Sequence, residues 1–263
     1  LYKDLDASAW TFTNWVATDR LMINGTLFGD DLTGSIRNDT INGGDGNDTL
    51  RGLAGSDQLN GGAGIDRISG GNGSDAINGG TGGDILSGGN GIDTVSYARS
   101  ASGVTINLGS TWQFGGDAAG DRIDGFENIT GSSHDDQIQG DGNINRLVGG
   151  SGADELTGSG GADRFVYLAF SDSGGEAASD RVRDFSQSQH DLIVVSAIDA
   201  LAGGADDSFT FIGKGAFDSA GQLRYFRSGL QTIIQADQNG DGMADLEIRL
   251  DGVITLTAAD FIL

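Results

Sequence analysis

The sequence predicts an all-β chain: a parallel β-roll made of two stacks of short repeats, followed by a C-terminal antiparallel β domain. Three observations lead to this fold class. A glycine- and aspartate-rich unit of nine residues recurs without a gap over 25–96. Units of the same length return over 131–166, and beyond 166 longer apolar runs replace the repeat. A fixed short period is typical of solenoids, in which each unit packs against its neighbours.

The first block, 25–96, contains eight units, which begin at Gly25 and then at every ninth residue up to Gly88. Position 8 is aliphatic in every unit. This indicates a three-residue strand at positions 7 to 9, with its middle side chain pointing inward. Position 6 is aspartate in all eight units, and these are the candidate metal ligands Asp30, Asp39, Asp48, Asp57, Asp66, Asp75, Asp84 and Asp93.

The second block, 131–166, contains four units, with Asp136, Asn145, Asp154 and Asp163 at position 6. Asn145 lacks a charge and should weaken its site, and His134 occupies a position that is glycine elsewhere. In the first unit of block one, Leu27 and Phe28 replace small residues, which we interpret as an apolar cap.

The stacked aspartates predict a metal. If two units make one turn of the coil, residues 18 apart stack about 4.8 Å apart on the same edge. Carboxylates that close repel each other by about 1 kcal/mol per pair in water. Carboxylate and carbonyl oxygens without histidine or cysteine form a hard oxygen site, which suits Ca²⁺ better than Mg²⁺ or Zn²⁺. We therefore predict several calcium ions, disorder without calcium and cooperative folding with it.

The composition excludes other partners. The net charge of −23 disfavours nucleic acid and anionic membranes. The chain has no cysteine, so it forms neither disulfides nor thiolate metal sites. It has no apolar run long enough to span a membrane. It starts at Leu1 without a signal peptide, so we interpret it as part of a longer protein with an upstream catalytic or adhesive domain.

The flanks divide the chain further. We interpret 1–24, with Trp10, Phe12 and Trp15, as a cap or junction. The segment 97–130 connects the blocks, and Val104–Leu108 alternates like a strand. In the C-terminal β domain, 167–263, and just before it, we predict antiparallel strands at Phe165–Phe170, Leu192–Val195, Phe209–Ile212, Leu230–Ile234 and Leu246–Leu250.

One loop of that domain has two interpretations. Its side chains Asp237, Asn239, Asp241 and Asp245 match the start of an EF-hand-like calcium loop. The final glutamate comes one place early for the full loop, and no flanking helices are evident. An acidic hairpin turn is the alternative, because Asn-Gly and Asp-Gly pairs favour hairpins.

The nonapeptides resemble the RTX family of exported Gram-negative proteins, and 162–200 and the tail Asp260–Leu263 resemble the C-terminal region of serralysin-type metalloproteases. The resemblance implies calcium ligation by position-6 aspartates and by backbone carbonyls of positions 2 to 4. It also implies passage through a type I secretion apparatus by means of a C-terminal signal, and an extracellular location, with cell-surface association left open. The glycines that keep the motif are Gly44, Gly46, Gly62, Gly64, Gly71, Gly73, Gly80, Gly82, Gly89, Gly91, Gly150 and Gly152.

The sequence favours a non-catalytic chain. A serralysin needs an H-E-x-x-H zinc motif, and the only histidines are His134 and His190. The favoured function is a calcium-folded secretion module of a larger protease, hydrolase or adhesin. A glycan-binding module and a calcium-dependent adhesin or surface-layer element are the alternatives.

Overall fold

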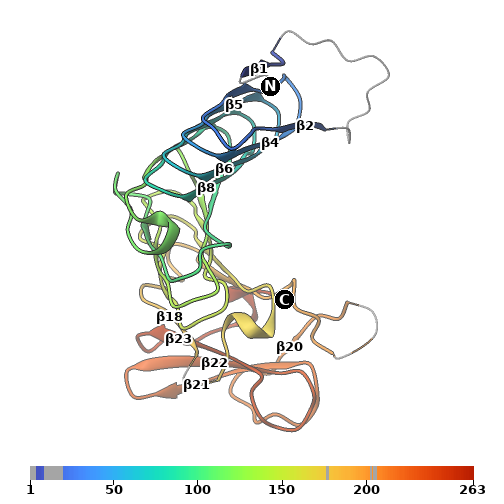
Figure 1. Ribbon diagram of the computed structural model, residues 1–263. Helices are drawn as coiled ribbons and strands as arrows, with labels where there is room; N and C mark the ends of the chain where they lie inside the picture. Colours follow the sequence, from blue (N-terminus) through green and yellow to red (C-terminus); the bar gives the residue numbers. More distant parts are fainter. Residues whose placement is uncertain (1–3, 9–19, 176–177, 202, 204–205) are drawn as a thin grey trace. The chain divides into compact units, whose positions relative to one another are not determined.

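The computed structural model describes residues 4–8, 20–175, 178–201, 203 and 206–263, and it is built almost entirely of strands (Figure 1). Within these residues no helix is long and apolar enough to cross a membrane. The helical elements described are short 3₁₀ turns, η1 (Gly116–Ala118), η2 (Phe170–Asp172) and η3 (Ala258–Asp260). The chain divides into two units, Leu1–Thr130 and Gly131–Leu263, which are treated separately below.

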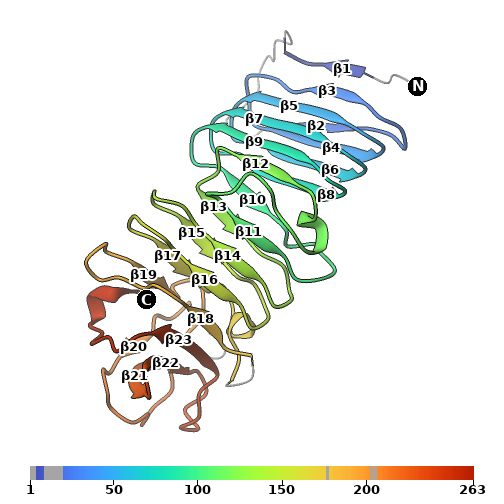
Figure 2. The ribbon, with the colours of Figure 1, turned by 90° about the vertical axis from the view of Figure 1, so that its left-hand side faces the viewer.

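The first unit contains two stacks of parallel strands, as predicted, and Figure 2 shows their succession along the roll. Successive nonapeptides alternate between the stacks. One stack contains β1 (Asp4–Asp6), β3 (Asp31–Thr33), β5 (Thr49–Ala54), β7 (Arg67–Asn72), β9 (Ile85–Asn90) and β12 (Arg122–Asp124). The other contains β2 (Leu21–Asn24), β4 (Asp39–Asp45), β6 (Gln58–Ala63), β8 (Ala76–Thr81), β10 (Thr94–Ser96) and β13 (Asn128–Thr130).

The register of the repeats confirms the predicted stacking of residues 18 apart. Leu50 lies opposite Ile68, and Ile68 lies opposite Leu86. Every position-8 side chain of the first block is at most 3% exposed, so these residues form the core between the two stacks. The strand predicted at Val104–Leu108 is β11 (Thr105–Asn107), and Ile123 of β12 takes the next layer opposite Leu86.

The second unit also continues as a parallel roll. One run of parallel strands is β15 (Arg146–Val148), β17 (Arg164–Val166), β19 (Leu192–Val194) and β24 (Phe261–Ile262). The other is β14 (Gln137–Gln139), β16 (Glu155–Thr157), β18 (Asp180–Val182) and then β23 (Leu246–Asp251). Antiparallel pairing was therefore the wrong prediction for Phe165–Phe170 and Leu192–Val195, because Phe165 and Ile193 stack as successive inward residues of one parallel ladder.

Antiparallel pairing begins only at the end of this sheet. There β23 pairs with β22 (Gln231–Asp237), and β22 pairs with β21 (Gln222–Ser228). The short β20 (Thr210–Phe211) pairs with β21 in parallel, so antiparallel pairing was also the wrong prediction for Phe209–Ile212. The buried side chains of this region form a conventional apolar core: Leu223, Ile233, Ile234, Leu246, Ile248 and Leu250.

The N-terminal cap is only partly described. Trp10, Phe12 and Trp15 lie outside the described residues. Leu27 and Phe28 are 70% and 68% exposed, so the apolar packing predicted for the first turn is not observed. Thr26 instead closes this turn by polar contacts with Asp30.

Candidate metal centres

The position-6 aspartates form a hydrogen-bonded ladder along each edge of the roll. The amide of Asp48 donates to Oδ1 of Asp66 at 2.8 Å, and the amide of Asp66 donates to Oδ1 of Asp84 at 2.8 Å. The same bond joins Asp57 to Asp75 on the other edge. Every such carboxylate in the first block is at most 4% exposed. One oxygen of each inner aspartate is thus held in place by the backbone of the preceding layer.

The other oxygen of most of these carboxylates has no partner. Leaving a buried charged oxygen without a hydrogen bond is costly, because water no longer solvates it. Either a proton or a cation must compensate the charge. The buried aspartate oxygens without a hydrogen-bond partner are Oδ1 of Asp30 and Oδ2 of Asp48, Asp57, Asp66, Asp75, Asp84, Asp93, Asp154 and Asp180.

Burial alters the acidity of these groups. Desolvation, with added repulsion from neighbouring aspartates, raises the pKa of Asp57 to about 7. The same causes raise the pKa of Asp84 to about 7 and that of Asp154 to about 8. These side chains therefore hold their protons to a higher pH than exposed aspartates do, because burial leaves their charge without compensation.

The unpaired oxygens face a cradle that only glycine leaves open. A Cβ built on Gly43 would overlap Oδ2 of Asp48 and lie 2.6 Å from the carbonyl oxygen of Gly61. Gly70 is placed in the same way, against Oδ2 of Asp75 and the carbonyl of Gly88. A carboxylate oxygen and a carbonyl oxygen from successive layers therefore converge beside the first glycine of most units.

Positions 2 and 4 supply further oxygen-rich backbone. Gly62 and Gly64 have φ of 113° and 137°, which glycine adopts readily. A Cβ on either residue would strike the carbonyl of Gly44 or Gly46 in the preceding layer. Gly150 and Gly152 of the second block have the same positive φ. At these positions the backbones of successive layers therefore approach closely through their carbonyl groups.

The donor set fits a hard divalent cation. Among the described residues, no group of three or more histidine, cysteine, aspartate or glutamate side chains could hold a metal by itself. Each turn offers one or two carboxylates together with backbone carbonyls. Calcium accepts six to eight oxygens in flexible geometry, whereas Mg²⁺ demands a small octahedron and Zn²⁺ favours nitrogen and sulfur. The residues present therefore fit Ca²⁺.

Sequence reasoning missed four members of the ladder or did not count them as ligands. Asp121, Glu127, Asp180 and Asp191 accept the amides of Asp84, Asp93, Asp154 and Asp163, respectively. Glu127 stands two residues before the buried Ile129, the same spacing as between positions 6 and 8 of the repeat. The missed aspartates each precede a strand in the pattern Asp-x-aliphatic, for example Asp121-Arg122-Ile123, but the preceding glycine turn is absent. That triplet is the signal that could have found them.

A further carboxylate pair lies in the second unit. Oδ2 of Asp154 and Oδ2 of Asp180 are both buried and unpaired. Burial, reinforced by the charge of Asp154, raises the pKa of Asp180 to about 9. Asp172, whose charge also acts on Asp180, is 8% exposed. Repulsion from Asp154 and Asp172 therefore acts on Asp180, which lies outside the nonapeptide repeats.

The acidic loop between β22 and β23 is closed by its own backbone. Both oxygens of Asp237 accept amide hydrogen bonds, from Gly240 at 2.7 Å and from Gly242 at 2.9 Å. Asp245 accepts the amide of Gln238, and Asp241 accepts that of Met243. The loop is thus the connection of an antiparallel hairpin, held by its own hydrogen bonds, and calcium binding by it stays a prediction.

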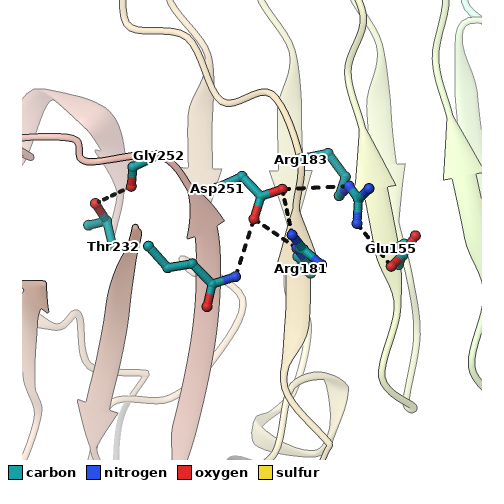
Figure 3. A network of polar contacts seen from close by, with 7 residues as sticks. Glu155, Arg181, Arg183, Thr232, Asp251 and Gly252 are labelled. Atoms are coloured by element: carbon teal, nitrogen blue, oxygen red, sulfur yellow. Dashed lines mark hydrogen bonds and ion pairs between the residues drawn. The ribbon is translucent and has the colours of Figure 1, made fainter. Parts of the chain in front are cut away.

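The carboxylate of Asp251 is balanced by arginine instead. Arg181 contacts it with two nitrogens, at 2.7 and 3.0 Å, and Arg183 lies 3.6 Å away (Figure 3). Although burial alone would raise it, the hydrogen bonds from Arg181 and Gln231 hold the pKa of Asp251 below its ordinary value. This contact joins β18 to β23 without any need for a metal.

Comparisons with known proteins agree with these features. Residues 110–263 match the family described as peptidase M10 serralysin C terminal, which is more than half of the chain. The chain belongs to this family. Residues 24–59 and 60–95 match the RTX calcium-binding nonapeptide repeat. The repeats are thus of the calcium-binding type, and repeats and serralysin C-terminal regions are non-catalytic modules. A sequence search of curated proteins gave no match.

Several solved structures show local likeness at low identity. Two subunits of the mannuronan C5-epimerase of Azotobacter vinelandii are each 20% identical, with TM-scores of 0.25 and 0.32. The alignments cover 90% and 92% of this chain and 80% and 91% of those chains. The extracellular lipase LipA of Serratia marcescens is 17% identical, with a TM-score of 0.31, and the alignment covers 94% of this chain and 40% of the lipase.

Proposed function

We propose that this chain is the calcium-folded module of an exported protein and that it carries a type I secretion signal in its C-terminal region. Calcium ions would be held by Oδ2 of the position-6 aspartates that lack a partner, together with carbonyls of neighbouring turns. The upstream part of the protein would supply a protease, another hydrolase or an adhesive activity. The observation that carries this proposal is the row of buried carboxylate oxygens without hydrogen bonds.

The ion would act by neutralising charge at a place where the chain cannot. Each inner turn aims one carboxylate oxygen into a space bounded by glycine backbone. A bound Ca²⁺ would supply a positive charge and accept these oxygens as ligands. The chain's own residues set the geometry: the amide of the preceding layer fixes Oδ1, and Oδ2 is left for the ion.

Folding on calcium binding would serve export. Calcium is scarce in the cytosol and abundant outside the cell, so the chain would stay unfolded until it leaves the secretion channel. The C-terminal tail supports this order. Phe261 is only 7% exposed and contacts Phe211, with ring centroids 5.1 Å apart. A secretion apparatus that reads the tail would therefore have to recognise it before β24 joins the sheet.

Calcium titration of the purified chain by calorimetry tests the proposal. The wild type should bind several ions, and Mg²⁺ at the same concentration should not replace them. The double variant Asp57→Asn/Asp75→Asn removes two buried charges from one edge and should bind fewer ions. Asp206→Asn, at an exposed position, serves as the matched control and should bind as the wild type does. A wild type that binds no calcium would contradict the proposal.

A second candidate function is the binding of an acidic glycan. Arg67 and Arg122 flank Ile85 on the same sheet, and Arg122 lies 5.0 Å from the ring of Trp112, which is 52% exposed. Guanidinium groups bind carboxylates, and exposed indoles stack on sugar rings. The double variant Arg67→Ala/Arg122→Ala should lose affinity for an acidic oligosaccharide, whereas Arg227→Ala should keep it. Equal affinity in both variants would exclude this surface.

A further inference from the structure

The nonapeptide turns occur in two forms that differ at positions 2 and 4. In eight turns both positions have positive φ, as in Gly71 (113°) and Gly73 (132°). These open turns begin at Gly43, Gly52, Gly61, Gly70, Gly79, Gly88, Gly149 and Gly158. In the other four, neither position has positive φ, and these closed turns begin at Gly25, Gly34, Gly131 and Gly140.

In the closed turns the position-2 amide occupies the oxygen that is free in most open turns. Ser35 donates its amide to Oδ2 of Asp39 at 2.6 Å, and Ser132 donates to Oδ2 of Asp136 at 2.6 Å. Thr26 makes the same bond to Asp30. The amide of Asp141 donates in this way to Oδ1 of Asn145 at 2.8 Å. In each closed turn the position-2 amide therefore satisfies one oxygen of the position-6 side chain.

Serine at position 2 satisfies the carboxylate twice. The hydroxyl of Ser132 donates to Oδ1 of Asp136 at 2.8 Å, and that of Ser35 lies 3.1 Å from Oδ1 of Asp39. Each hydroxyl also accepts the position-4 amide, from His134 and Arg37, both at 3.1 Å. Positions 2, 4 and 6 are thereby tied into one network. Thr26 differs, because its amide and hydroxyl both bond to Oδ2, which leaves Oδ1 of Asp30 unpaired.

The open turns lack this hydrogen-bond network, and most of them differ from the closed turns at Oδ2 of the position-6 aspartate. In seven of the eight, Oδ2 of the position-6 aspartate is buried without a partner. The residue type alone does not decide the form, since Leu53 has φ of 82° and its turn also leaves Oδ2 of Asp57 unpaired. What accompanies the unpaired oxygen is the backbone conformation at positions 2 and 4.

We infer that the closed turns of Ser35 and Ser132 hold their aspartates by internal hydrogen bonds and take no calcium, whereas the open turns take the ions. This inference rests on the proposed function. A carboxylate that accepts an amide and a hydroxyl hydrogen bond is stabilised as an anion, and an ion could reach its Oδ2 only by breaking the hydrogen bond from the amide. Ser35 lies in the second unit of the first block and Ser132 in the first unit of the second block, so each block has such a turn near its start.

Converting one form into the other tests the inference. Native mass spectrometry of the full chain in calcium counts the bound ions. The double variant Ser35→Gly/Arg37→Gly gives the second turn the glycine pattern of the open turns and should bind one ion more than the wild type. Ser35→Ala keeps the amide bond and should leave the number of ions unchanged. The reverse double variant, Gly71→Ser/Gly73→Arg, should bind one ion fewer.

The first variant decides the matter even if the reverse variant fails to fold. A wild type that binds several ions and a Ser35→Gly/Arg37→Gly variant that binds the same number would overturn the inference while leaving the proposed function intact. The inference would also fail if a calcium-bound structure held an ion against Oδ2 of Asp39. A wild type without bound calcium would overturn the proposed function and this inference with it.

Discussion

The nonapeptide roll and the antiparallel strands β21 to β23 stabilise buried structure by different means. In the first block of the roll, each nine-residue unit buries one aliphatic side chain and one aspartate, such as Leu86 and Asp84. In the antiparallel region, apolar residues from three strands pack together, and Asp251 at the sheet is paired with Arg181. Under the proposed function, the first region takes its counter-charge from outside the chain, whereas the second supplies its own.

This difference predicts which region should need calcium in order to fold. A region with a continuous apolar core retains its driving force for folding when the ion is removed. A region that buries many like charges loses stability, because the repulsion returns and each carboxylate remains desolvated. The following predictions measure that contrast, from the largest expected effect to the smallest.

Chelation should separate the two regions most strongly. In EGTA the amides of β5 to β9 should lose most of their protection against hydrogen exchange, because the ladder carboxylates are left without a counter-charge. The amides of β21 to β23 should keep more of theirs. Hydrogen exchange with mass spectrometry resolves both sets in the full chain. Equal protection of the two regions in EGTA would remove the distinction.

Core truncation should reveal the same contrast through calcium. Leu86 and Ile248 are each at most 1% exposed, so Leu86→Ala and Ile248→Ala should each cost about 2–5 kcal/mol. We expect Leu86→Ala to raise the calcium concentration at which the roll folds. Ile248→Ala should lower the thermal stability of its region with little change in that concentration. Matched shifts in both variants would mean that the two regions fold as one calcium-dependent whole.

Removal of one ladder charge should have an intermediate effect. Asp66→Asn keeps the shape of the side chain but takes a charge from an open turn, so one ion should bind much more weakly. A single ion at a hundredfold excess over its Kd contributes about 2.7 kcal/mol, which sets the expected loss of stability in calcium. Thermal unfolding at several calcium concentrations measures it. An unchanged stability at every concentration would show that Asp66 holds no ion.

Protonation of the buried aspartates at low pH should partly replace the neutralisation of their charge by calcium. Burial raises the pKa of Asp57 to about 7 and of Asp66 to about 6 in the metal-free fold. A carboxyl whose folded pKa lies above its unfolded value favours folding at low pH, and this contribution is lost as the pH rises through the folded pKa. In EGTA, β structure should therefore increase from pH 8 to pH 5. In calcium, the ion concentration needed for folding should increase over the same range, because protons compete for the oxygens.

The ion pair between Arg181 and Asp251 should have the smallest effect on stability. Arg181 and Asp251 have side chains that are 42% and 25% exposed, and partly exposed pairs contribute about 0.2–1 kcal/mol. Asp251→Asn should thus reduce stability slightly and leave the calcium midpoint unchanged. A large calcium-dependent effect would place Asp251 in the same class as the ladder aspartates.

Much of the roll follows from the nine-residue period. Because Asp48 and Leu50 recur in register, the sequence predicts the parallel strands, the inward aliphatic residues and the rows of carboxylates. The nine-residue period ends at 166, so it predicts no parallel strands beyond that residue. Val182 and Ile193 continue the parallel sheets, but they follow Leu156 and Phe165 at spacings that differ from 18. Because of this irregular spacing, the nine-residue period does not predict that these residues belong to the parallel sheets.

Residue types alone do not predict whether a turn is open or closed. Asp39 and Asp57 occupy the same position of the repeat, yet only Asp57 has an unpaired oxygen. The difference depends on the backbone at position 2, where Leu53 adopts a positive φ that its side chain does not favour. The sequence pattern predicts which carboxylate oxygens lie in rows along the roll. The hydrogen bonds within each turn decide which of these oxygens are left to bind a metal ion.

Far-UV circular dichroism of the full chain, titrated from EGTA into calcium, tests the central idea most directly. We predict a largely disordered spectrum at pH 8 in EGTA, a cooperative transition to β structure in calcium, and no such transition in the same concentration of Mg²⁺. A β-rich spectrum already complete in EGTA at pH 8 would mean that the buried carboxylates are tolerated without an ion, and it would contradict the account.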